Sequence, residues 1–212
     1  MRRTNKAGIV FVALGLALFG AYAAWHGTRN WVPVDIAAPI FPGSTLNKDF
    51  SVNVDAPYTI EIAADKKKID FDTLNCLLGM SSVLDKKCTT AEVVTSDWAL
   101  TEGTKLMGSG SSSTDHGGAW ANDTISREIG SFQGKSGHRY KVEVKFLEDG
   151  TALNAATPRL VIGVHPEVYE GDAFRSAFVF LFSAGFVLIG CCLVVASVLV
   201  RLCRRTPRTA RS

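Results

Sequence analysis

The two ends of this sequence contain no acidic residue. Residues 1–25 hold three basic residues and residues 201–212 hold five, without one Asp or Glu. The remaining 15 basic residues and all 20 acidic residues lie in residues 26–200, which carry a net charge of −5 within a chain of net charge +3. Basic segments beside membrane spans stay on the cytoplasmic side. The distribution predicts two cytoplasmic termini, and it favours contacts with anionic lipid over binding of nucleic acid.

Two stretches of the chain lack charge altogether. They are residues 7–25, a run of 19, and residues 176–200, a run of 25. At about 1.5 Å of rise per helical residue, the second run exceeds the roughly 30 Å hydrocarbon core of a bilayer. A single segment in lipid satisfies its backbone polar groups only as a helix. Both runs are therefore predicted to be transmembrane helices, which makes the lipid bilayer the first expected partner.

The first apolar run has two interpretations. It is longer than the usual apolar region of a signal peptide, about 7–15 residues, which favours an uncleaved signal anchor. Ala21-Tyr22-Ala23 fits a small-x-small cleavage pattern, so a cleaved signal peptide is the alternative. Ala13, Ala17 and Ala21 recur at four-residue spacing and are predicted to line a face where another helix approaches closely; the alternative is that small residues are simply common in membrane spans.

These features predict a protein of the inner membrane of a Gram-negative bacterium with its central domain in the periplasm. The short arginine-rich tail and the economical loops favour the bacterial assignment. The predicted segments are a cytoplasmic N-terminus (1–6), a first span (7–25), an extracytoplasmic domain (26–175), a second span (176–200) and a basic cytoplasmic tail (201–212).

The middle segment has little helical periodicity and a clear period of two. Apolar and polar residues alternate over residues 58–62 and 140–146, and residues 160–164 place Leu160, Ile162 and Val164 on one face. Such alternation buries one face of a sheet and leaves the other in water. Seven or eight short strands predict an all-β domain, an antiparallel β-sandwich. The weaker strand candidates are residues 31–40, 50–54, 93–101, 105–109 and 125–132.

The run Gly137-x-x-Tyr140-x-Val142-x-Val144 resembles the penultimate strand of many immunoglobulin-like and carbohydrate-binding-like sandwiches. The resemblance implies a sandwich of one of these two kinds. The cysteine pair that joins the sheets of true immunoglobulin domains is absent, because Cys76 and Cys88 are only twelve residues apart.

One segment departs from the β pattern. The apolar residues of 71–78 are spaced for one face of a helix, which predicts a short helical insertion over residues 72–78. Cys76 lies in it and Cys88 follows, and no other cysteine lies outside the apolar runs and the tail. Because the domain is expected in an oxidising compartment, the two are predicted to form a disulfide.

The sequence lacks the motifs of catalysis and of metal binding. Its four histidines are at least 22 residues apart, and there is no Cys-x-x-Cys, nucleophile elbow or phosphate-binding glycine loop. The sequence therefore indicates a protein that is not an enzyme and that holds neither a metal nor a cofactor.

The segment with most binding character is the loop predicted over residues 108–123. Loops longer than about 12–15 residues are usually functional or disordered. An aromatic ring framed by acids and amides stacks on a sugar or anchors a protein partner; the alternative is that the ring packs back onto the sheet. The candidate binding residues are Asp115, His116, Trp120, Asn122 and Asp123.

Together these observations favour an interaction protein: a two-pass membrane protein whose periplasmic sandwich binds a protein partner. An accessory subunit of an envelope complex and an immunity-type protein both fit this description. The alternative is a membrane-tethered module that binds a glycan or another ligand through Trp120 and its polar neighbours.

Overall fold

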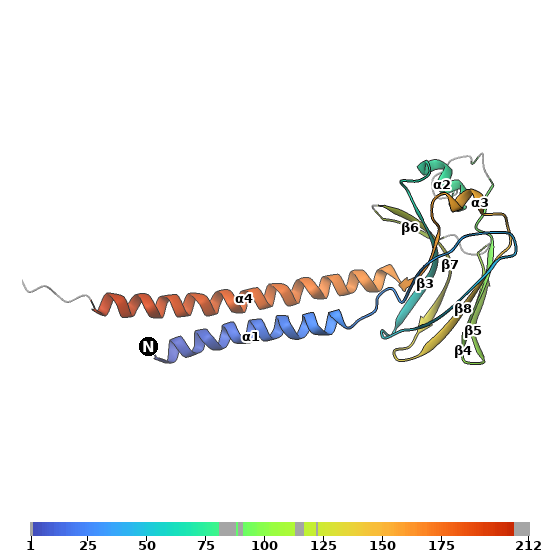
Figure 1. Ribbon diagram of the computed structural model, residues 1–212. Helices are drawn as coiled ribbons and strands as arrows, with labels where there is room; N and C mark the ends of the chain where they lie inside the picture. The colour runs from blue at the N-terminus through green and yellow to red at the C-terminus, as the bar shows by residue number, and fades with distance from the viewer. Residues whose placement is uncertain (1, 81–87, 89–90, 113–116, 122, 206–212) are drawn as a thin grey trace, which may run out of the picture. The chain divides into compact units, whose positions relative to one another are not determined.

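The structure is a computed structural model of the chain. It describes residues 2–80, 88, 91–112, 117–121 and 123–205. The chain divides into two units, a helical pair formed by Met1–Arg29 and Tyr169–Ser212 and a β domain formed by Asn30–Val168 (Figure 1). The helical pair thus joins the two ends of the sequence, and the β domain is one continuous segment.

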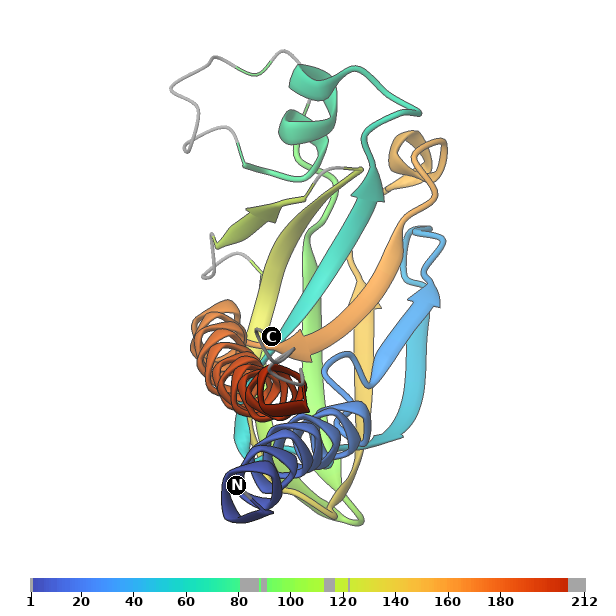
Figure 2. The ribbon, with the colours of Figure 1, turned by 90° about the vertical axis from the view of Figure 1, so that its left-hand side faces the viewer.

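The strands of the described residues form two antiparallel sheets that pack as a sandwich (Figure 2). The five-stranded sheet has the order β1 (Val34–Ala37), β9 (Arg159–Val164), β3 (Ala56–Asp65), β7 (Thr124–Gly134) and β6 (Gly118–Trp120). The four-stranded sheet has the order β2 (Thr45–Ser51), β8 (Arg139–Phe146), β4 (Ser96–Glu102) and β5 (Lys105–Ser111).

Strand β8 shows why the sandwich forms. Its apolar residues Tyr140 and Val142 are buried, as are Val144 and Phe146, and the residues between them are exposed. Burying each such side chain contributes about 1.5–3 kcal/mol. The inward residues of β3 and β9 supply the opposite face of the core. The predicted antiparallel β-sandwich is confirmed.

Aromatic side chains join the two sheets. The Phe132 ring of β7 lies 5.4 Å from the Tyr58 ring of β3 and 5.5 Å from the Tyr140 ring of the opposite sheet. Trp98 of β4 packs against Gly130 of β7, where a Cβ would overlap the indole. Glycine at 130 therefore lets the indole reach the backbone of the facing sheet.

Strand β2 is one edge of the four-stranded sheet and carries a charge on its core-facing side. Lys48 pairs in register with Val142, whose side chain is fully buried, yet Lys48 is exposed. Inward-facing charges on edge strands oppose pairing with the edge of another sheet.

Some element boundaries differ from the sequence-based prediction. The strand predicted over residues 50–54 is β2, which begins at Thr45 and ends at Ser51. Its first residues are mostly polar and exposed, so they give no alternating pattern. The short elements β6 and α3 (Thr151–Asn154) were not predicted, because three or four residues carry too little periodicity to stand out. The helical insertion is confirmed as α2 (Phe71–Leu77).

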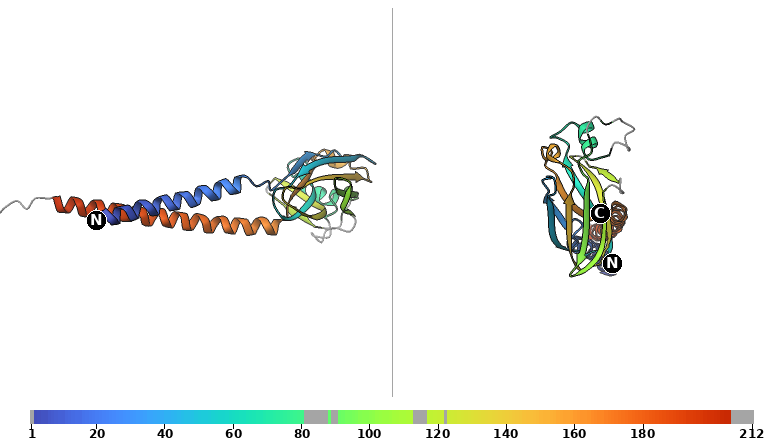
Figure 3. Two further views of the ribbon diagram at one scale, coloured as in Figure 1. Left: turned by 90° about the horizontal axis from the view of Figure 1, so that it is seen from below. Right: turned by 90° about the vertical axis from the view of Figure 1, so that its right-hand side faces the viewer.

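The helical pair consists of α1 (Arg2–Gly27) and α4 (Pro166–Arg205), which run side by side in opposite directions (Figure 3). Pro166 opens α4 at a position where a missing backbone N–H costs nothing. Both helices are long and apolar enough to cross a membrane. Two helices of this kind are typical of a membrane protein.

Glycines make the closest contacts between α1 and α4. A Cβ at Gly8 would overlap the backbone of Gly190, and a Cβ at Gly15 would overlap the backbone of Ser183. The expectation that Ala13, Ala17 and Ala21 form the contact face is wrong, because all three are exposed. The two contact positions on α1, Gly8 and Gly15, are seven residues apart. Seven residues are close to two full helical turns, so both positions lie on the same face of α1, whereas a four-residue step rotates away from that face.

Candidate functional site

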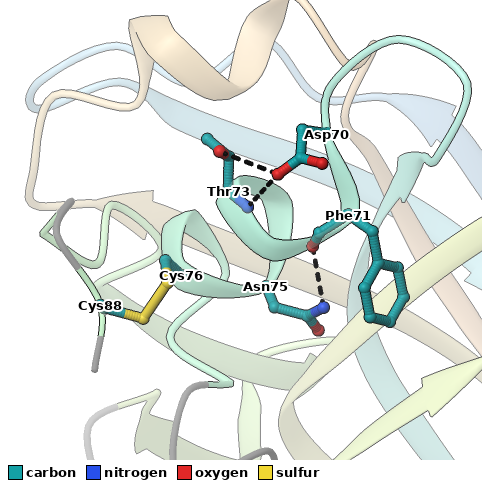
Figure 4. The surroundings of a disulfide bond; sticks show 6 residues. All are labelled: Asp70, Phe71, Thr73, Asn75, Cys76 and Cys88. Carbon is teal, nitrogen blue, oxygen red and sulfur yellow. Dashed lines mark hydrogen bonds between the residues drawn. A yellow bond between two sulfur atoms is a disulfide. The ribbon is translucent and has the colours of Figure 1, made fainter. Parts of the chain in front are cut away.

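The connection from β3 to β4 contains the disulfide. Asp70 caps α2 by accepting a hydrogen bond from the backbone N–H of Thr73 at 3.1 Å (Figure 4). Asn75 donates to the Phe71 carbonyl oxygen at 2.8 Å, one turn earlier. Cys76 and Cys88 form the predicted disulfide, with their Cα atoms 5.5 Å apart. The disulfide ties the short helix to the segment that leads back to the sandwich.

A buried arginine holds this connection from inside the sandwich. Arg127 of β7 is one of the largest fully buried side chains of the described residues. Its guanidinium donates to the Leu78 carbonyl oxygen at 2.8 Å and to the Ser112 carbonyl oxygen at 2.7 Å, and it forms an ion pair with Glu92. A buried charge is stable only when its hydrogen bonds are made. Arg127 therefore fixes the end of α2, the segment before β4 and the end of β5 together.

Gly79 permits this arrangement. Its φ of +76° favours glycine, and a Cβ there would overlap the guanidinium of Arg127 and the carboxylate of Glu92. Arg127 is not among the site residues that the sequence predicts. The signal was present, because Arg127 stands between Ile125 and Ile129 at an apolar position of an alternating pattern.

The predicted binding loop is partly strand. Residues 108–111 belong to β5 and residues 118–120 form β6. Asp115, His116 and Asn122 lie outside the described residues. The backbone of Trp120 pairs with Ile125, whose side chain is fully buried.

Asp123, the last of the predicted site residues, is exposed and forms an ion pair with Lys67. The distance between the Lys67 Nζ and the Asp123 carboxylate is 2.7 Å. The hydrogen bond and the charge of this carboxylate raise the pKa of the Lys67 ammonium above its ordinary value. Lys66 also donates its backbone N–H to the Asp123 carbonyl oxygen at 3.0 Å. The structure thus places Asp123 beside the basic turn after β3, a contact that the sequence did not reveal.

The open face of the four-stranded sheet holds a polar concavity of about 550 Å³. Asp49 pairs in register with Lys141, and Ser51 pairs with Arg139, so that these two basic residues of β8 stand beside oxygen-bearing side chains of β2. The residues that line the concavity are Asp49, Phe50, Ser51, Gly103, Arg139, Tyr140 and Lys141.

At the end of the same sheet, His138 lies 2.5 Å from Glu102, measured between Nδ1 and the carboxylate oxygen. Outward positions of the four-stranded sheet are polar, charged or aliphatic, and none of the described ones is aromatic. Mixed charges on an open surface suit electrostatic complementarity with a macromolecule, whereas small-molecule sites are mostly deep and apolar.

Polar side chains gather where the helical pair ends. Tyr22 and Ser176 share a hydrogen bond across the two helices. His26 Nδ1 lies 3.1 Å from the carboxylate of Asp172, which is almost fully buried. The guanidinium of Arg29 lies 3.7 Å from the centre of the Trp25 ring. The Tyr22–Ser176 and His26–Asp172 contacts fix the rotation of α1 against α4 at this end of the pair.

Within the part of the chain that the structure describes, no three His, Cys, Asp or Glu side chains are grouped closely enough to hold a metal ion.

Fold and surface together define a disulfide-bonded β-sandwich protein with a pair of apolar helices. No known protein family matches its sequence, and neither does any curated protein. Among solved structures, the chain is similar to the crystal structure of a protein from Sulfurospirillum deleyianum at 15% sequence identity and a TM-score of 0.49. The similarity covers 63% of this chain and 97% of that one.

Proposed function

We propose that this chain is a two-pass membrane protein that presents its β-sandwich to a protein partner in the periplasm. In this proposal the partner is a component of an envelope complex or a toxin that the chain neutralises. The sandwich is taken as immunoglobulin-like or carbohydrate-binding-like, in line with the strand pattern around Tyr140. The chain acts by binding and not by catalysis.

The proposed topology is supported by charge and by the disulfide. Basic residues without acidic ones flank both apolar helices at the chain ends, which favours two cytoplasmic termini. The Cys76–Cys88 disulfide favours an oxidising compartment for the sandwich, such as the periplasm. The two observations are independent and support the same orientation.

The open face of the four-stranded sheet is the observation that carries the proposed partner binding. Its polar concavity combines Arg139 and Lys141 with Asp49. Phe50 and Tyr140 also line it, but both side chains are buried in the core and offer little ring surface for stacking on a sugar. An arginine beside a lysine and a carboxylate recognises a complementary charged surface and sets its orientation. A protein partner satisfies these requirements better than a small apolar ligand does.

A matched pair of charge reversals tests this assignment. We expect Lys141→Glu to abolish co-purification of a stoichiometric partner in mild detergent, because it reverses the charge beside Asp49. Lys68→Glu makes the same change at an exposed position away from the concavity and should leave the complex intact. Recovery of the same partner at the same ratio with Lys141→Glu would contradict the proposed surface.

Thiol labelling tests the topology in the same cells. With Cys191, Cys192 and Cys203 replaced by Ala, a membrane-impermeant maleimide should label Lys68→Cys once the outer membrane is opened. Ser212→Cys should react only after the inner membrane is permeabilised. The reverse pattern would place the sandwich in the cytoplasm.

Ligand binding through Trp120 is the alternative function, and it has a separate test. A glycan that stacks on this ring quenches tryptophan fluorescence, and Trp120→Ala removes the response. Under the proposed protein-binding function we expect no saturable quenching across a panel of periplasmic glycans.

A further inference from the structure

An apolar groove of about 690 Å³ lies between α1 and α4 near the end of the helical pair that carries Trp25. Ala21, Tyr22 and Trp25 line it from α1, and four residues of α4 complete its walls. Those residues of α4 are Phe174, Arg175, Phe178 and Val179.

The walls of the groove are held in place by contacts of their own. The Tyr22 hydroxyl is bonded to Ser176, and the Tyr22 and Trp25 rings lie 5.7 Å apart. On the other side, the Phe174 and Phe178 rings pack edge to face at 4.8 Å. The small side chain of Ala21 leaves the space between the two ring pairs open. A preformed site of this kind binds without the entropic cost of ordering its walls.

One charged side chain lines the groove. Arg175 is exposed, and among the described residues the structure shows no ion pair for it. Asp172, one turn earlier on α4, is engaged with His26 and almost fully buried. Arg175 also ends the uncharged run of α4, at the level where the polar headgroups of a bilayer begin. Its guanidinium is thus placed to accept an anion beside an apolar slot.

We propose that this groove binds one diacyl phospholipid, with the lipid phosphate on Arg175 and one acyl chain between the aromatic rings. The inference rests on the proposed membrane insertion of the helical pair. A planar guanidinium makes two parallel hydrogen bonds to a phosphate, and the apolar walls match a hydrocarbon chain. The helix of a second chain copy fits less well, because it would cover Arg175 without an opposing charge.

Native mass spectrometry of the full chain in detergent tests the proposal, with palmitoyl-oleoyl phosphatidylglycerol as the added lipid. We expect one saturable lipid adduct per chain. Diacylglycerol carries the same chains without the phosphate and should bind about tenfold more weakly, since one charged hydrogen-bonded contact is worth roughly a factor of ten or more.

Two variants with matched controls locate the site. Arg175→Gln should weaken lipid binding about tenfold, and Arg201→Gln, which removes an arginine from the other end of the apolar run, should leave it unchanged. Ala21→Phe fills the groove and should abolish the saturable adduct. Ala13→Phe makes the same change at an exposed position of α1 outside the groove and should retain it. Helical content measured by circular dichroism verifies that each variant is folded.

Three results would overturn the lipid site: no saturable adduct, equal affinity of Arg175→Gln and wild type, or a lipid-free dimer that Ala21→Phe dissociates. These failures differ from failure of the proposed function. A chain that labels with the expected topology but binds no lipid saturably loses only this inference. A chain recovered outside the membrane fraction loses both.

Discussion

Arg127 shows how much a single residue can organise inside a small sandwich. Its guanidinium donates hydrogen bonds to the carbonyl oxygens of Leu78 and Ser112 and pairs with Glu92. These bonds satisfy carbonyl groups that lie outside the regular strand pairing of the sheets. Buried ionic groups of this kind add little net stability, but removing one partner leaves the others unsatisfied. The value of Arg127 therefore lies in fixing one conformation of the connection between β3 and β4.

Replacing this side chain is expected to be costly. Arg127→Met retains apolar contacts but leaves two buried carbonyl oxygens unpaired, and we expect it to lower the free energy of unfolding by about 3 kcal/mol. Glu92→Gln is the comparison, because the amide oxygen of Gln can still accept from the guanidinium and Glu92 is partly exposed; it should cost less than Arg127→Met does. Thermal unfolding followed by tryptophan fluorescence measures both. Equal melting temperatures for Arg127→Met and wild type would show that the buried network is not needed.

At the scale of elements, the short helix α3 depends on Asp149. This carboxylate accepts hydrogen bonds from the backbone N–H and the hydroxyl of Thr151, and these bonds lower the pKa of Asp149 below its ordinary value. The folded state therefore binds this proton less readily than the unfolded state does. The stabilisation is complete above the unfolded pKa and is lost as the pH falls through the folded one.

The pH dependence of stability checks this assignment. Asp149→Ala should melt below wild type at about pH 6, and the difference should disappear once the pH has fallen through the lowered folded-state pKa of Asp149. Glu148→Ala removes the neighbouring exposed carboxylate, which accepts no hydrogen bond from the described residues, and should not show this pattern. A difference in melting temperature between Asp149→Ala and wild type that persists in acid would show that packing, and not the carboxylate charge, causes the effect.

The contact between α1 and α4 depends on glycine. A side chain at Gly190 would overlap the backbone of Gly8, whereas Gly185 has nothing within 4 Å of an added Cβ. We expect Gly190→Leu to separate the helices and Gly185→Leu to leave them packed. Cysteines at Phe11 and Phe186, whose rings lie 5.9 Å apart, report the contact by cross-linking once the native free cysteines are replaced. Efficient cross-linking in Gly190→Leu would exclude glycine-dependent packing.

The elements also show what sequence could predict. Alternation of apolar and polar residues identified β8 and β9, each of which buries one face. The same alternation over residues 58–62 identified β3, although β3 is buried on most of both faces. Helical spacing of apolar residues identified α2. Local patterns failed where a long-range contact decides. Nothing near Ala17 indicates that the helices meet instead through a seven-residue repeat of glycines. Among the predicted site residues, Asp123 forms an ion pair with Lys67. Lys67 lies more than 50 residues earlier in the chain, so no local pattern indicates the contact.

At the scale of the whole molecule, the two units differ in how they meet solvent. The β domain has its own buried core, whereas the exposed large apolar residues concentrate on α1 and α4. We expect residues 30–168, secreted to the periplasm, to be soluble without detergent and to keep the Cys76–Cys88 disulfide. The full chain should require detergent. Aggregation of the folded fragment would show that its surface depends on the helices.

The same fragment gives the contribution of the disulfide. Replacing Cys76 and Cys88 together by Ser should lower its free energy of unfolding by about 3 kcal/mol. The loss is no larger because the disulfide closes a short loop, which removes less entropy from the unfolded chain than a long loop would. Urea unfolding measures the difference, and a loss near zero would mean that Arg127 alone restrains the connection.

Strand β2 ends one sheet with Lys48 on its core-facing side. Proteins confined to a plane collide far more often than proteins free in solution. An unprotected edge strand would let those collisions join copies of the protein through their sheets. A single ammonium group that must be stripped of water before a neighbour can join makes such growth unfavourable. Replacing it with valine should convert dispersed protein into clusters without altering the fold itself.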